Sequence, residues 1–184
     1  MCNTAIEESG TNLEYVPMKL RTKELCKAAV QQYPWMFEKV PDAVKDYDFC
    51  RWAVSIADNL GRENFKYVPD QFKTPELCMI AVKKDGRMLE HIPSSLITEE
   101  MCIAAITTTH AAVQLVPDSL LTEDMCILAL GKWPKEFLYL PERMLTPRVC
   151  EAARMGLPYC NDQLRARICE ILDRVENDHA QNKE

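Results

Sequence analysis

Cysteine recurs along this chain with a period of 24 residues. Neighbouring members of the series are 24 residues apart except for one interval of 28, and they stand at Cys2, Cys26, Cys50, Cys78, Cys102, Cys126 and Cys150. An alanine follows each of them by three residues, and a proline precedes each of the last six by nine residues. Columns that share one register at a period of about 20 to 50 residues are typical of a solenoid. The chain is therefore predicted to be a stack of short repeats, each of which buries its apolar face against its neighbours.

The residues around each cysteine have the pattern of an α-helix. The position four residues before the cysteine is Asp46 in one repeat and threonine in the others, at Thr22, Thr74, Thr98, Thr122 and Thr146. Both residue types cap helix N-termini by accepting a hydrogen bond from a backbone N–H. Pro75 and Pro147 suit the first helical position. Apolar residues just before the cysteine and three and four residues after it share one face with the cysteine, which predicts a helix of about ten residues.

A shorter segment leads from each α-helix to the next proline. The α-helices are expected to stop near Pro34, Gly86 and Pro134, and about six residues remain before the next proline phrase. Because this is less than two α-turns, the segment is predicted to be partly 3-10 helix. Its buried residues are expected at Phe37 and Val40, Phe65 and Val68, Leu89 and Ile92, Val113 and Val116, and Phe137 and Leu140. The phrase P-x-x-L then turns the chain, with a buried plug expected at Leu20, Val44, Phe72, Leu96, Leu120 and Met144.

These elements predict an all-α fold: an α-solenoid or superhelix of 24-residue two-helix repeats with a C-terminal capping helix. A single domain over residues 1–176 would contain a partial repeat at 1–21, repeats at 22–45, 46–73, 74–97, 98–121 and 122–145, a partial repeat at 146–160 and the capping helix at 161–176. Residues 177–184 are predicted to be a flexible tail. The four additional residues in "SIADNLGREN" predict one extra helical turn, to about Leu60, with Gly61 as the stop. Because no capping phrase precedes Cys2, the chain is expected to begin inside a repeat.

The pattern T-x-E-x-C-x-x-A-[VI], followed by V-P-x-x-L, resembles the bacterial repeat family of unknown function DUF4116. The resemblance covers roughly residues 13 to 153, with Asp46, Arg148 and the four-residue insertion as departures. The period is also similar to that of leucine-rich variant repeats, which combine an α-helix with a 3-10 helix in a superhelix. Both resemblances imply a helical-repeat fold, and neither implies a catalytic residue.

No catalytic, cofactor-binding or metal-ligating residue is predicted. Equivalent residues of stacked helices lie about 8–10 Å apart, which is too far for disulfides or for one shared zinc ion. The cysteine column is therefore interpreted as small apolar filler of the core, and Cys160 and Cys169 are the thiols outside it that could be reactive. The histidines, including His110 and His179, lack partners at ligand spacing and are interpreted as surface residues.

Charge and hydropathy narrow the possible partners and the compartment. The net charge of −6 argues against nucleic acid as a partner. The sequence contains no apolar run of about 18 residues, so membrane insertion is not predicted. The cysteine count is odd and the N-terminus does not read as a signal peptide, which favours a reducing compartment. The predicted location is cytoplasmic: the bacterial cytosol, or a host cytosol if the protein is a secreted effector.

Candidate binding residues lie in the columns that vary between repeats. The position two residues before each proline is expected to face outward as a strip, which is formed by Tyr15, Lys39, Tyr67, His91, Leu115 and Tyr139. Aromatic rings in such a strip suit protein recognition. A second candidate region is the break between helices, with Trp35 and Trp133, although these rings could simply pack over helix ends. A streak just after the cysteines, at Met79, Ile103 and Ile127, is either core or a further contact strip.

The predicted function is that of a non-enzymatic helical-repeat scaffold, without a cofactor, that binds a protein or peptide partner along its solenoid surface. The alternative is the recognition portion of a larger protein, such as a bacterial effector or an enzyme, whose catalytic part is absent from this chain. An enzyme that acts on a small molecule or through a metal ranks below both, and nucleic-acid binding ranks last.

Overall fold

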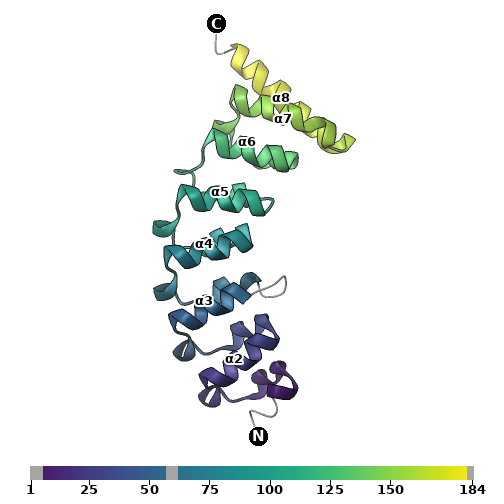
Figure 1. The fold of residues 1–184 in the computed structure, drawn as a ribbon. Coiled ribbons are helices and arrows are strands. Elements are labelled where there is room, and N and C mark those ends of the chain that lie inside the picture. The colour runs from purple at the N-terminus through teal and green to yellow at the C-terminus, as the bar shows by residue number, and fades with distance from the viewer. Residues whose placement is uncertain (1–5, 57–61, 182–184) are drawn as a thin grey trace. The chain divides into compact units, whose positions relative to one another are not determined.

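The computed structural model describes residues 6–56 and 62–181, and helices are the only regular elements in those ranges. The predicted all-α helical-repeat fold is thus confirmed. The chain divides into two compact units, Met1–Ile97 and Thr98–Glu184. The prediction of a single domain over residues 1–176 stays a prediction. Figure 1 shows the succession of α-helices within each unit.

Each repeat contains a ten-residue α-helix followed by 3-10 helices. The first unit comprises η1 (Gly10–Tyr15), η2 (Met18–Leu20), α2 (Lys23–Gln32), η3 (Pro34–Lys39), η4 (Asp42–Val44), α3 (Tyr47–Ile56), η5 (Arg62–Tyr67), η6 (Asp70–Phe72), α4 (Pro75–Lys84), η7 (Gly86–His91) and η8 (Ser94–Leu96). The second unit comprises α5 (Glu99–Thr108), η9 (Ala112–Leu115), α6 (Glu123–Lys132), η10 (Pro134–Tyr139), η11 (Glu142–Met144), α7 (Pro147–Gly156), η12 (Leu157–Tyr159) and α8 (Asp162–Gln181).

The predicted helix caps form in every repeat. The side chain of each capping threonine accepts a hydrogen bond from the backbone N–H three residues later, at Thr22, Thr74, Thr98, Thr122 and Thr146. Asp46 accepts the equivalent bond from Phe49 at 2.9 Å. Hydrogen bonds from the Lys23 side chain and from the Phe49 N–H hold the pKa of Asp46 below its ordinary value. Asn161 caps α8 by accepting from the N–H of Leu164 at 2.9 Å.

The core lies between a layer of α-helices and a layer of 3-10 helices of four to six residues. In the first unit α3 packs against α4, while η5 packs against both η3 and η7. The cysteine and alanine columns from Cys26 to Ala153 are at most 4% exposed. The ten residues predicted to be buried in the 3-10 layer, from Phe37 to Leu140, are all at most 9% exposed, so this prediction is confirmed. Small residues on the α-helices leave room for the large side chains of the 3-10 layer.

The predicted plug is wrong by one position in several repeats. Leu20 is 54% exposed, and the plug residues from Val44 to Leu120 are only half-buried. The next residue along the chain is buried in its place: Lys45 is 7% exposed, Leu121 is 7% exposed and the Lys73 side chain is 9% exposed. Lysine at this position is buried because its ammonium finds acceptors inside the stack, as described below.

The C-terminal helix is longer than predicted. Helix α8 continues to Gln181, so the tail predicted from residue 177 is helical for its first five residues. The apolar stripe of α8 explains its attachment to the second unit, because Ile168 and Leu172 are 0% and 3% exposed. The extra turn predicted to reach Leu60 and Gly61, the partial repeat around Cys2 and the end of the tail at residues 182–184 lie outside the described residues.

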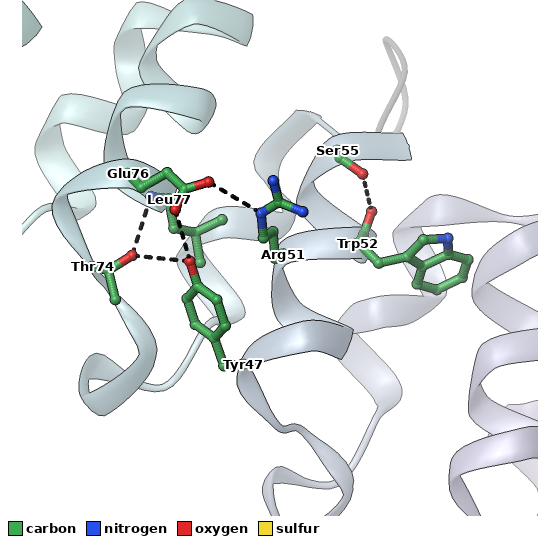
Figure 2. Close-up of polar contacts among 7 residues, drawn as sticks. All are labelled: Tyr47, Arg51, Trp52, Ser55, Thr74, Glu76 and Leu77. Atoms are coloured by element: carbon green, nitrogen blue, oxygen red, sulfur yellow. Dashed lines mark hydrogen bonds and ion pairs between the residues drawn. The ribbon is translucent and has the colours of Figure 1, made fainter.

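Polar contacts join neighbouring α-helices at their exposed ends. In Figure 2 the Arg51 side chain of α3 donates to Glu76 of α4 at 3.2 Å, and the Tyr47 hydroxyl lies 3.4 Å from the Thr74 hydroxyl. In the second unit Arg148, which departs from the acidic pattern, binds Glu123 at 2.9 Å. Exposed pairs of this kind contribute about 1 kcal/mol or less. Buried apolar contacts therefore supply most of the stability.

We expect the substitution Ala105→Leu to lower the free energy of unfolding by about 1–3 kcal/mol. Ala105 is 0% exposed on α5, which packs against α6, so the three additional heavy atoms of leucine have no room. Chemical denaturation followed by circular dichroism measures the change. The matched control is Ala104→Leu, at a half-buried neighbouring position on the same helix. Equal stability of the two variants would contradict close packing at the alanine column.

Candidate functional site

The candidate binding surface is formed by the turns that begin at the recurring prolines. We define the proline-turn face as the residues from two before to four after Pro17, Pro41, Pro69, Pro93, Pro117 and Pro141. Each proline follows the end of one 3-10 helix and begins a single tight turn, in which the N–H three residues later returns to the proline carbonyl at 2.8–2.9 Å. The fixed φ angle of proline suits this start. The same turn therefore recurs once in every repeat.

In the first unit a cation four residues after the proline ties one repeat to the next. Arg21, Lys45 and Lys73 donate to the backbone carbonyls of Lys39, Tyr67 and His91 at 2.6, 2.8 and 2.9 Å. Each acceptor is the residue two before the next proline, which is a member of the predicted strip. These three cations thus hold the backbone of the strip in place.

The two lysines of this column are almost completely enclosed. The Lys45 ammonium also donates to Asp42 Oδ1 at 2.9 Å and lies 5.0 Å from the centre of the Phe37 ring. The Lys73 ammonium is 2.7 Å from Asp70 Oδ1 and 5.5 Å from the centre of the Phe65 ring. A carboxylate, a carbonyl and a ring face together replace the water that each ammonium loses.

A groove of about 490 Å³ opens between the proline turns of the first unit. Its walls include Val40, Pro41, Val68 and Pro69, and Tyr67 also lines it. Charged side chains line the remainder, at Glu38, Asp42, Lys45, Lys66, Asp70 and Lys73, and Met18 lines the end that the first turn contributes.

The second unit has a smaller groove of about 300 Å³ at the equivalent repeat position. Leu121 lines it at the position that Lys45 and Lys73 hold in the first unit, and Tyr139 lines it at the position of Tyr67. Asp118 is the one charged residue among the described residues that line it. The position of the groove is therefore set by the repeat, whereas its chemistry differs between the units.

The strip residues lie on this face with unequal exposure. Tyr15 and Tyr139 are 84% and 58% exposed. Lys39, Tyr67 and His91 are half-buried, as is Leu115. The structure brings Tyr67 and Tyr139 to grooves, and Tyr15, Lys39 and His91 are not among the groove-lining residues described. That these residues bind a partner stays a prediction.

The tryptophans of the second candidate region are half-buried and lie apart from both grooves. The rings of Tyr33 and Trp35 are 4.9 Å apart between centres, and the Lys132 ammonium lies 5.6 Å from the centre of the Trp133 ring. Trp35 lies in η3, three residues after the end of α2, and Trp133 is the C-cap residue of α6. A binding role for Trp35 and Trp133 stays a prediction.

The residues just after the cysteines form a partly exposed streak. Ile103 is 40% exposed, and Met79 and Ile127 are half-buried. Because these side chains are partly buried, they are neither fully part of the core nor a fully exposed contact strip.

The cysteines in the core are not poised for reaction. Burial raises the pKa of Cys26, Cys50, Cys78, Cys102 and Cys126 to about 11. Outside the column, Cys160 is 8% exposed and donates weakly to the Gly156 carbonyl, while Cys169 is half-buried on α8. Within the described ranges no group of three or more potential metal ligands comes together.

Two features of the second unit have no counterpart in the sequence-based predictions. Glu136 is 1% exposed; its Oε2 accepts from Gln114 at 2.9 Å, and its Oε1 has no hydrogen-bond partner among the residues that the structure describes. In the preceding repeat Ala111 adopts a left-handed backbone with φ of 65°, and η9 is two residues shorter than η10. Neither feature has a local signal in the sequence: residue 111 is alanine and not glycine, and the partner of Glu136 is Gln114 of the preceding repeat.

Comparison with known proteins supports the resemblance of the N-terminal part. A family model described as "Domain of unknown function (DUF4116)" matches residues 1–45. The matched range includes the first proline turns and the strip residues Tyr15 and Lys39. Neither the curated proteins nor the solved structures gave a match. Among the described residues, no helix combines the length and apolar character that a bilayer crossing requires.

Proposed function

We propose that this chain is a non-enzymatic helical-repeat scaffold that binds a protein or peptide partner through its proline-turn face. The observation that carries the proposal is the recurrence of a groove at one repeat position in both units, with a tyrosine on its wall each time. A tyrosine offers an apolar ring and a polar hydroxyl with few rotatable bonds, which suits partner recognition.

The rigidity of the face also supports this role. Backbone carbonyls of the strip in the first unit are fixed by Arg21, Lys45 and Lys73, so a partner would meet a surface that is already ordered. Binding to an ordered surface loses less conformational entropy, which favours affinity.

We also propose that the protein works in a reducing cytoplasm, either of a bacterium or, for a secreted effector, of a host cell. The cysteines in the described ranges are free thiols, and free thiols persist where disulfides are kept reduced. The same face would serve if the chain is the recognition portion of a larger bacterial effector or enzyme. Sequencing the full gene product for a catalytic domain beside this chain separates these two cases.

The double substitution of Tyr67 and Tyr139 by alanine should lower the affinity for the partner by about tenfold or more, while the melting temperature stays nearly unchanged. Removing an aromatic anchor from an interface typically costs more than 1 kcal/mol of binding free energy. The partner is first isolated with this chain as bait, and its affinity for wild type and variant is measured by calorimetry.

The matched control is Tyr159→Ala, because Tyr159 is 87% exposed and lies outside the proline-turn face. Unchanged affinity of the double variant would contradict the proposal. A large fall in its melting temperature would instead identify the two tyrosines as parts of the core.

A further inference from the structure

We infer that the groove of the first unit binds an extended peptide segment that carries two basic side chains, lysine or arginine, three residues apart. The inference rests on the proposed function and specifies the chemistry of the partner. Two acidic positions, one in each of two successive proline turns, carry it.

Asp42 and Asp70 each form an ion pair whose negative end faces solvent. Their side chains are 78% and 82% exposed, whereas the partner side chains of Lys45 and Lys73 are 5% and 9% exposed. Each lysine is three residues after its aspartate and reaches inward to a backbone carbonyl. A cation that approaches the groove therefore meets the carboxylates first and the ammonium groups only behind them, and its attraction to the nearer charge is stronger.

The rest of the groove fits the stem of a basic side chain. Pro41 and Pro69 directly precede the two aspartates, line the groove and are half-buried, so each carboxylate has apolar surface next to it. Lysine and arginine pack their methylene stems on such surfaces while the charge reaches an acceptor. Tyr67 also lines the groove, and the Lys66 ammonium already lies 4.9 Å from the centre of its ring, so the incoming cations are assigned to the two carboxylates and not to this ring.

The repeat sets the spacing of the two basic residues. Asp42 and Asp70 occupy the same position, one residue after the proline, in successive repeats. Stacked helices are about 8–10 Å apart. A peptide in the extended polyproline conformation advances about 3.1 Å per residue. Three residues of peptide thus span one repeat, and residues three apart face the same side of a polyproline helix.

The groove of the second unit does not share this chemistry. Its single acid, Asp118, is paired with Arg143 at 2.9 Å, and the Arg143 side chain is itself 44% exposed. The position of the buried lysine is Leu121. Among its described lining residues that groove offers one acidic position, whereas the first groove offers two in successive turns, so the inference concerns the first unit alone.

The test uses the full chain and three labelled peptides built from alanine and proline. The first carries two lysines three residues apart, the second carries them two apart, and the third has glutamates in place of the lysines. Fluorescence anisotropy should show that the first binds best and the third does not bind. Asp42→Asn and Asp70→Asn should each lower the affinity for the first peptide by about twofold to fivefold, as expected for exposed ion pairs. Added salt should also lower the affinity of the wild-type chain for the first peptide.

Asparagine keeps an acceptor for Lys45 or Lys73, and circular dichroism verifies that each variant is folded. Asp118→Asn is the matched control and should leave binding unchanged. Equal binding of the lysine and glutamate peptides, or full affinity in the Asp42→Asn and Asp70→Asn variants, overturns the inference. If none of the peptides binds while the substitution of Tyr67 and Tyr139 still weakens the bait-selected partner, the basic-peptide inference fails and the scaffold function stands.

Discussion

Raising the pH from 8 to 11 should unfold the protein. The pKa values of Cys26, Cys50, Cys78, Cys102 and Cys126 are raised from 9.0 to about 11 in the folded chain because the buried thiols are desolvated. Folding therefore favours the protonated thiol. Between pH 9 and 11 the folded chain binds more protons than the unfolded chain, so the free energy of unfolding falls as the pH rises.

The expected loss is large because all five thiols act in the same direction. Each contributes about 1 kcal/mol of lost stability by pH 10 and about 2 kcal/mol by pH 11. The sum is comparable to the whole stability of a typical domain, about 5–15 kcal/mol. Below pH 9 the contribution is fully retained. Helicity measured by circular dichroism across this pH range gives the transition.

A variant in which one cysteine is replaced by alanine tests whether the thiols cause the transition. In Cys102→Ala the loss of unfolding free energy between pH 8 and pH 10 should be about 1 kcal/mol smaller than in the wild type. Comparing each protein with itself at pH 8 removes the effect of the small cavity. If the loss is identical in both proteins, other groups that titrate at alkaline pH cause the transition.

The substitution Phe37→Ala should lower the free energy of unfolding by about 3–5 kcal/mol. Phe37 is fully buried in η3, its ring meets the Phe49 ring edge-on at 5.9 Å between centres, and it faces the Lys45 ammonium. Removing the ring leaves a cavity and also removes one of the groups that replace water around a buried cation. Urea denaturation at pH 7 measures the change.

The contrasting variant is Tyr15→Ala, which removes an aromatic ring from another 3-10 helix of the same unit. Tyr15 is 84% exposed, so its loss should change the unfolding free energy by about 0.5 kcal/mol or less. Similar losses in Phe37→Ala and Tyr15→Ala would mean that the 3-10 layer does not form the core.

Features that depend on a few neighbouring residues could be predicted from the sequence. The cap at Thr22 and the end of α2 before Pro34 follow from local hydrogen bonding and from the geometry of proline. The burial of Cys26 and Ala29 follows from a period that every repeat shares. At these positions the local signals and the repeat register predict the same structure, so the prediction needs no knowledge of contacts between repeats.

Features that depend on contacts between repeats could not be predicted in the same way. Lys45 lies in a polar turn and resembles a surface residue, but the carbonyl of Tyr67, 22 residues later, provides its acceptor. The buried Glu136 is held by Gln114 of the preceding repeat. The strip could be expected to face outward from its period, whereas the grooves depend on the relative placement of successive turns, which the sequence pattern does not contain.

The buried cysteine column gives each repeat its own reporter of local opening. Cys26, Cys50 and Cys78 in the first unit, and Cys102, Cys126 and Cys150 in the second, sit at one equivalent position on successive helices. A thiol-specific reagent can modify such a residue only during moments when its helix separates from its neighbours. The rate at each cysteine, read by mass spectrometry, would yield a map of opening energies with one value per repeat and without any engineered label.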